Sequence, residues 1–169
     1  MTFNPSKRIP ITQNPKLMKA SRHFKKKIWE KPDFRSDHSF SCNIKLSVLA
    51  SLTANQALAL IAVSKQRPRI KGFQTQSFLE ITEVIAAFDY PLKGKYLLRT
   101  NPTLDYNGNP MSMHTGYFLW QVAKIYQDEV YKYPKKYGVW GHGIDDLYFE
   151  GIILRKIGKH YYGIIEMGS

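Results

Sequence analysis

The amino-acid sequence predicts an α+β fold in which an antiparallel sheet packs against two or three helices. Residues 39–50 carry the first supporting pattern, an alternation that places one apolar set on a single face: Phe40, Cys42, Ile44, Leu46 and Val48. A period of two residues is typical of a half-buried strand. A helix signal follows at once, because Thr53 and Gln56 have capping-box spacing. We expect this strand–helix unit, ending near Gln66, to be the centre of the fold.

The composition is that of a folded chain. With 169 residues, 43% hydrophobic and 14% aromatic, the chain is long and apolar enough for one domain, or one domain with an extension. Its single cysteine, Cys42, excludes an internal disulfide, and we expect a buried structural thiol. The longest apolar run, 57–63, is far shorter than the roughly 20 residues of a membrane span. We therefore expect a soluble or peripheral protein made in a reducing compartment.

The charge is strongly positive and unevenly distributed. The net charge is +12, and residues 1–35 hold ten Lys and Arg against two acidic residues, or +8 of that total. Such a balance favours polyanionic partners, namely nucleic acid, nucleoprotein or an anionic membrane surface. We therefore divide the chain into a basic N-terminal arm, 1–35, and a single α+β domain, 36–169.

The arm contains a candidate amphipathic helix. Asn14 and Pro15 have the order of an N-cap and first helical residue, and the helix is expected to end near Lys31. Its basic and apolar residues form a candidate surface for a membrane or nucleoprotein: Lys16, Lys19, Arg22, Phe24, Lys25, Lys26, Lys27, Ile28 and Trp29. Such helices lie on anionic membranes or in a partner's groove. The alternative is that the apolar stripe docks on this protein's own core and the lysines form a solvated face.

A second basic segment follows the central helix. It offers four cations as candidate phosphate contacts, which are Lys65, Arg67, Arg69 and Lys71. The ordinary alternative is an exposed loop, which Pro68 keeps out of the helix.

The remaining pattern predicts helices and short strands in alternation. Ser77 and Glu80 have the spacing that caps a second helix over 78–88. Residues 95–99 form a short strand candidate. Residues 113–133 fit helical spacing, with Ser112 or Thr115 as the cap, although their aromatic richness also fits a strand; we favour the helix.

Turn signals organise the rest of the second half. Asn107 and Gly108 suit a tight hairpin. Residues 134–146 form a glycine-rich aromatic loop. The chain then closes with an apolar segment and a C-terminal hairpin that turns at Gly158.

No catalytic signature stands out. The five histidines lack the short pair spacings of a zinc site, and there is no phosphate-binding glycine loop. The best acidic constellation is Asp145, Asp146 and Glu150, which would suit Mg²⁺-dependent phosphodiester cleavage, although Asp145 is equally suited to cap a helix. We expect a non-enzymatic protein without a metal or cofactor.

The order of elements is the most specific feature of the sequence. It comprises a basic arm, strand 40–48, helix 53–66, basic loop 67–71, helix 78–88, an extended middle region, and a closing segment, 147–154, with a hairpin reaching 162–166. This order resembles the matrix proteins of rhabdoviruses, above all the small basic ones of plant-infecting members. The arm lacks the Pro-Pro-x-Tyr and Pro-Ser/Thr-Ala-Pro budding motifs.

The resemblance implies a structural role. Proteins of this family self-associate, condense the ribonucleoprotein and attach to the inner face of the viral envelope, and the basic arm would correspond to their membrane- and neighbour-binding N-terminus. The expected partners are therefore viral nucleocapsid or RNA, an anionic membrane surface and further copies of the chain. The expected locations are the virion and the host cytoplasm or membrane periphery. Independently of the resemblance, the short basic run Lys25–Lys27 offers a nuclear-import patch as an alternative interpretation, which adds the nucleus as a further location.

Two alternatives to this role remain. The first is a basic RNA- or DNA-binding protein without membrane affinity, which would bind nucleic acid with a steep salt dependence. The second is a small metal-dependent nuclease that uses the acidic constellation.

Overall fold

A mixed sheet forms the centre of the computed structural model, which describes residues 17–30, 38–57, 69–71, 81–111 and 113–169. In these residues the sheet has seven strands, in the order β1 (Leu17–Lys19), β5 (Tyr96–Arg99), β4 (Val84–Phe88), β9 (His160–Gly168), β8 (Tyr148–Ile157), β2 (His38–Lys45) and β3 (Arg69–Lys71). All neighbours are antiparallel except β4 and β9, which are parallel. The α+β class is confirmed, and the sheet is mixed rather than wholly antiparallel.

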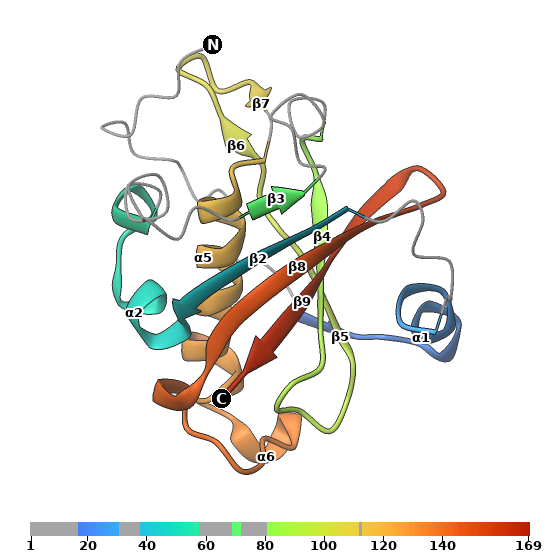
Figure 1. Ribbon diagram of the computed structural model, residues 1–169, viewed down its shortest axis with the longest axis vertical. Coiled ribbons are helices and arrows are strands. Elements are labelled where there is room, and N and C mark those ends of the chain that lie inside the picture. The colour runs from blue at the N-terminus through green and yellow to red at the C-terminus, as the bar shows by residue number, and fades with distance from the viewer. Residues whose placement is uncertain (1–16, 31–37, 58–68, 72–80, 112) are drawn as a thin grey trace.

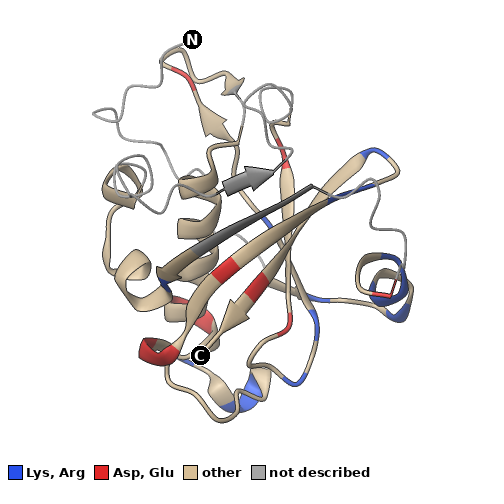
Figure 2. Cartoon of the chain, viewed as in Figure 1, with Lys and Arg blue, Asp and Glu red and all other residues tan. Residues whose placement is uncertain are grey.

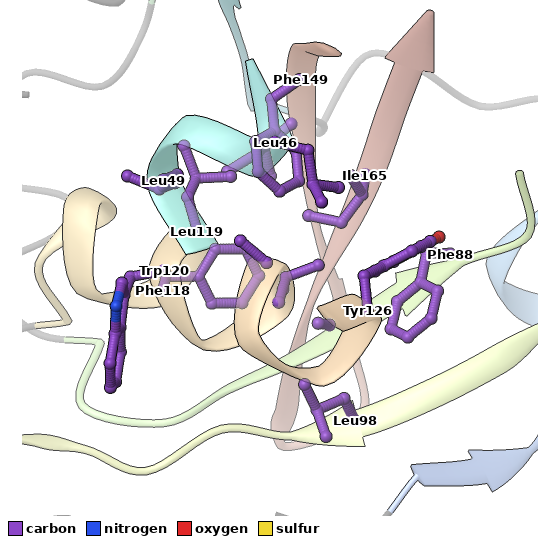
Figure 3. Packing of buried hydrophobic residues seen from close by; sticks show 14 of the residues in the cluster. Leu46, Leu49, Phe88, Leu98, Phe118, Leu119, Trp120, Tyr126, Phe149 and Ile165 are labelled. Atoms are coloured by element: carbon purple, nitrogen blue, oxygen red, sulfur yellow. The ribbon is translucent and has the colours of Figure 1, made fainter. Parts of the chain in front are cut away.

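One long helix covers one face of the sheet. Helix α5 (Thr115–Ile125) continues as a π-helical turn, η2 (Tyr126–Val130), and lies behind β2, β8 and β9 in Figure 1. The short helix α2 (Leu46–Ser51) packs beside it, and the indole of Trp120 donates a hydrogen bond to the carbonyl of Leu52 at 2.8 Å. These two helices and the sheet enclose the larger core, part of which Figure 3 shows.

Helix α5 approaches the sheet closely at Gly163 of β9. A Cβ atom added there would lie 2.6 Å from Cζ of Phe118 and 3.3 Å from Cγ1 of Val84. The glycine therefore allows the aromatic ring of the helix to rest on the strand backbone.

The opposite face of the sheet carries a smaller cluster and helix α1 (Arg22–Ile28). Its buried members are Ala20, Ile28, Ala87, Leu97, Tyr162 and Ile164. Strand β4 is buried on both faces, because its alternate side chains point to opposite sides of the sheet. Val84 and Phe88 belong to the larger core, and Ala87 belongs to the smaller cluster. The sheet is thus a middle layer between α5 and α1.

The two predicted hairpins are confirmed. Strands β8 and β9 pair antiparallel and turn at Gly158, whose φ is +61°. Strands β6 (Thr103–Leu104) and β7 (Pro110–Met111) enclose the turn at Gly108, whose φ is +81°. The carboxylate of Asp105 accepts hydrogen bonds from the backbone of Asn107 and Asn109, which lowers its pKa.

The strand predicted over residues 40–48 ends earlier. Strand β2 ends at Lys45, and the chain then forms α2, in which Leu46, Leu49 and Ala50 are buried while Val48 is 46% exposed. The buried residues recur at helical spacing, so the strand pattern was wrong after residue 45. The side chain of Cys42 lies outside what the structure describes, and its burial stays a prediction.

The capping box at Thr53 is confirmed. The backbone of Thr53 donates to Oε1 of Gln56 at 3.0 Å, and the backbone of Gln56 donates to Oγ1 of Thr53 at 3.2 Å. Residues 54–57 are helical, and the remainder of the predicted helix lies outside the described residues.

The second predicted helix is wrong in its last part. Residues 84–88 form β4, an interior strand between β5 and β9, and the segment 72–80 lies outside the described residues. An interior strand is apolar on both faces, so its sequence resembles that of a buried helix. The predicted strand at 95–99 is confirmed as β5.

The ambiguous segment 113–133 is helical, as favoured, but its cap differs from both candidates. His114 is the N-cap, and its Nδ1 accepts a hydrogen bond from the backbone of Gly116 at 3.0 Å. Within the loop 134–146, the chain forms helix α6 (Pro134–Tyr137) and a 3₁₀ turn, η3 (Ile144–Asp146).

Candidate functional site

Helix α1 holds four of the six basic residues of the predicted membrane or nucleoprotein surface, which are Arg22, Lys25, Lys26 and Lys27. Its N-cap is Ser21, whose hydroxyl oxygen accepts from the backbone of Phe24, and the preceding residues 17–19 form β1 rather than helix. Within the described residues 17–30, the predicted helix is therefore confined to residues 22–28. Lys25, Lys26 and Lys27 lie in its last turn, where cations interact favourably with the helix dipole.

The end of α1 is fixed to the sheet. Ile28 is fully buried, and its backbone carbonyl accepts a hydrogen bond from the guanidinium of Arg155 on β8, itself only 4% exposed. The ring of Trp29 lies 4.7 Å from the ammonium of Lys95, which also pairs with Asp89 at 2.6 Å. Arg155 thus satisfies a carbonyl at the helix end that has no partner within the helix.

The outward side of α1 is basic and partly apolar. Lys19, Arg22, Lys26 and Lys27 are exposed, and Lys25 is half-buried. Met18 is 54% and Phe24 38% exposed, and the ring of Phe24 lies 6.5 Å from that of Tyr162. We call the set Met18, Arg22, Phe24, Lys26 and Lys27 the α1 surface. Lys19 alternates with Met18 on β1 and lies beside Gly94 and Tyr96, on the other face of the sheet. Cations beside exposed apolar side chains are the composition that suits an anionic bilayer surface.

Two of the predicted anchoring residues do not belong to this surface. Ile28 points into the smaller core, and Trp29 is half-buried against Lys95. The prediction of a membrane contact is wrong for Ile28, because its side chain is fully buried in the smaller core. For Trp29 it stays a prediction, because that side chain is half-buried. Lys16 lies outside the described residues.

The second predicted basic segment is not entirely a loop. Arg69 and Lys71 belong to β3, whose backbone pairs with β2. Lys65 and Arg67 lie outside the described residues, as do the side chains of β3. The contact of these four side chains with phosphates stays a prediction.

The three residues of the acidic constellation, Asp145, Asp146 and Glu150, do not act together. The carboxylate of Asp146 accepts from the backbone of Gly143 at 2.9 Å and so caps η3, while Glu150 lies on β8 beside Gly168. Asp145, which the sequence offered as a helix cap, is exposed and does not cap η3. Within the described residues, no three His, Cys, Asp or Glu side chains lie together in a way that would hold a metal ion.

The tertiary structure assembles a second basic surface that the sequence analysis missed. Lys93, in the turn between β4 and β5, donates its backbone N–H to the carbonyl of Tyr137 in α6. Around this contact, Lys132 and Lys135 are exposed, and Tyr133 and Trp140 are 46% and 51% exposed. We call the set Lys93, Lys132, Tyr133, Lys135 and Trp140 the α6 surface. The alternation of Tyr and Lys over 131–137 was the available sequence signal.

The acidic groups beside the α6 surface are partly neutralised. Glu129 accepts hydrogen bonds from Lys136 at 2.8 Å and from the hydroxyl of Tyr137. These bonds lower the pKa of Glu129 and raise that of Lys136. Asp145 and Asp146 lie farther along the loop, and Figure 2 shows their acidic segment separate from basic α6.

The loop that carries Trp140 is held by aromatic contacts. The backbone N–H of Trp140 donates a hydrogen bond to the carbonyl of Pro91 at 3.1 Å, and the Trp140 ring meets that of Tyr90 edge-on at 5.5 Å. His142 packs against both rings, and its carbonyl accepts from the hydroxyl of Tyr131. Trp140 is therefore exposed on a fixed support.

Comparison with known proteins identifies no relative. No family model, curated protein or solved structure matches this chain. No helix in the described part of the chain has the length and apolar character needed to cross a bilayer.

Proposed function

We propose that the protein is a structural assembly protein of the matrix kind, which self-associates and links nucleoprotein to an anionic membrane surface. The observation that supports this role most directly is the α1 surface. It presents Arg22, Lys26 and Lys27 to solvent beside Met18 and Phe24, while Ile28 and Arg155 fix the helix to the sheet. A membrane would thus meet a preformed surface rather than an unfolded arm.

The basic and the apolar side chains of the α1 surface should respond differently to salt. Each cation near an anionic bilayer contributes on the order of 1 kcal/mol, which salt screens. The apolar side chains Met18 and Phe24 contribute through burial, which salt does not screen. Both parts are needed for peripheral attachment, because neither three cations nor two apolar residues alone holds a protein firmly on a bilayer.

Sedimentation with vesicles tests the proposal. The wild-type protein should sediment with phosphatidylserine-containing vesicles and not with pure phosphatidylcholine vesicles. K26Q/K27Q should lose about 2 kcal/mol, or roughly thirtyfold in affinity, at low salt. M18S/F24S should lose affinity at all salt concentrations.

A matched control removes two charges elsewhere. Lys156 and Lys159 are exposed at the tip of the β8–β9 hairpin, which Figure 2 shows apart from α1. K156Q/K159Q should therefore sediment like the wild type. Equal losses in the two double variants would mean that net charge alone matters and would contradict a defined α1 surface. Analytical ultracentrifugation of the same protein variants in the absence of vesicles measures self-association.

The alternative of a nucleic-acid-binding protein without membrane affinity makes the opposite prediction. Its wild type would bind RNA and would not sediment with anionic vesicles at any salt concentration.

A further inference from the structure

We propose that the α6 surface binds single-stranded nucleic acid, with Tyr133 and Trp140 stacking on bases and Lys93, Lys132 and Lys135 contacting phosphates. The proposal goes beyond the membrane attachment assigned to α1, because it concerns a separate surface and assigns the chemistry of its partner.

The two basic surfaces are physically distinct. Both approach the turn after β4, where Lys93 contacts α6 and Lys95 contacts Trp29 at the end of α1. The charge of Lys95 is paired with Asp89, so it does not join the two surfaces into one. Figure 2 shows α1 and α6 as separate basic segments at different places on the molecule. A ligand of α6 is therefore not an extension of the membrane contact at α1.

Their apolar components also differ in kind. The α1 surface exposes Met18 and Phe24, whereas the α6 surface exposes the flat, polar-edged rings of Tyr133 and Trp140. Base–aromatic stacking is tolerant of sequence because every base has a π-face, and proteins that bind single strands combine such rings with a basic groove or track. The rings of α6 have the composition of such a platform.

Lysine side chains lie close to the exposed ring of Tyr133. The ammonium groups of Lys132 and Lys136 lie 5.6 Å and 5.8 Å from the ring centroid of Tyr133. Lys136 is already bonded to Glu129, whereas no ion pair in the described structure involves Lys93, Lys132 or Lys135. These three lysines are thus available to an anionic chain.

The ring of Trp140 is held in place without a ligand. Trp140 is fixed by its backbone bond to Pro91 and by its contact with Tyr90. Tyr133 is the N-cap residue of α6, which ends at Gly138 with a φ of +61°. A preorganised platform loses little conformational entropy when a base stacks on it.

The test measures binding of a fluorescein-labelled 20-nucleotide oligouridylate by fluorescence anisotropy. K132Q/K135Q should reduce the magnitude of the slope of log affinity against log salt by about 1.4, at about 0.7 for each phosphate contact of a single strand. Y133A/W140A should bind about tenfold or more weakly at every salt concentration. Oligouridylate should also quench tryptophan fluorescence in the wild type, and W140F should abolish most of that quenching.

Controls elsewhere on the surface match each change. K156Q/K159Q removes two charges at the hairpin tip, and Tyr106→Ala removes an aromatic side chain that is 50% exposed beside the β6–β7 turn. Both should bind oligouridylate like the wild type, and circular dichroism verifies that every variant is folded.

The outcomes separate this proposal from membrane attachment through α1. Loss of RNA binding with retained vesicle binding in K132Q/K135Q, and the reverse in K26Q/K27Q, supports both assignments. Loss of vesicle binding alone in the α6 variants would assign that surface to a membrane and overturn the nucleic-acid proposal. Absence of oligouridylate binding by the wild type, or equal losses in the α6 and hairpin-tip variants, would also overturn it while leaving the α1 proposal standing.

Discussion

The guanidinium of Arg155 donates a hydrogen bond to the backbone carbonyl of Ile28, and this contact joins strand β8 to the end of α1. The two residues are 127 positions apart in the sequence. The bond explains why a buried arginine is retained on the sheet, because it satisfies a helix-end carbonyl in an apolar layer.

Replacing Arg155 with leucine should loosen α1. Loss of a hydrogen bond from a charged donor should lower the free energy of unfolding by about 1.5–3 kcal/mol, measured by urea denaturation. Limited proteolysis should cleave residues 17–30 faster than in the wild type. Lys156→Leu is the control, since Lys156 is the exposed neighbour on the same strand. Unchanged stability of Arg155→Leu would contradict the assigned role of the contact.

Ile28 and Phe24 should respond differently to truncation although they lie on the same short helix. Ile28→Ala removes a fully buried side chain and should cost about 2 kcal/mol or more. Phe24→Ala removes a partly exposed ring and should cost less than about 1 kcal/mol. Chemical denaturation measures both, and equal costs would show that α1 is not oriented as described.

Deletions of the N-terminal arm should distinguish its parts. Removing residues 1–35 takes away β1, which pairs with β5, and Ile28, which fills the smaller core. That deletion should lower the melting temperature, whereas removal of residues 1–16 leaves both elements in place and should change it little. Thermal unfolding followed by circular dichroism measures the difference. A 1–35 deletion as stable as the full chain would instead support an arm independent of residues 36–169.

Gly163 should not tolerate a side chain while Phe118 is present. Gly163→Ala places a Cβ atom 2.6 Å from the Phe118 ring and should cost about 1–3 kcal/mol through overpacking. Adding Phe118→Leu should recover part of that loss, so the two changes should be non-additive in a double-mutant cycle. Strict additivity would argue against direct contact between α5 and β9 at this position.

Stability should fall in mildly acidic solution through His114. Burial lowers its pKa below the ordinary 6.5, and the neutral ring caps α5 by accepting the Gly116 N–H. The unfolded chain therefore binds the proton more readily, so this contribution is complete above pH 6.5 and is lost as the pH falls through the lowered pKa. Melting temperatures from pH 7.5 to 4.5 measure the slope.

His114→Asn provides the comparison for that prediction. Asparagine accepts a hydrogen bond at the N-cap but does not titrate, so its melting temperature should depend less steeply on pH in this window. An equally steep profile would assign the pH dependence to other groups.

Local sequence determined the elements that are defined by neighbouring residues. The hairpins at Gly108 and Gly158, the strand β5, the helix α5 and the capping box at Thr53 follow from turn chemistry, capping and periodicity. Each depends on interactions between residues close in the chain, so its signal is present in the sequence itself. The same holds for the positive charge, which predicts anionic partners.

The tertiary structure decided what long-range contacts control. Residues 84–88 carry an apolar run that suits helix or strand, and only their position between β5 and β9, with cores on both faces, makes them a strand. The stripe of α1 was equally suited to a membrane or to the protein's own sheet, and packing places Ile28 inside. The α6 surface forms because the turn after β4 brings Lys93 into contact with α6. Sequence periodicity does not predict this contact, because the two segments are far apart in the chain.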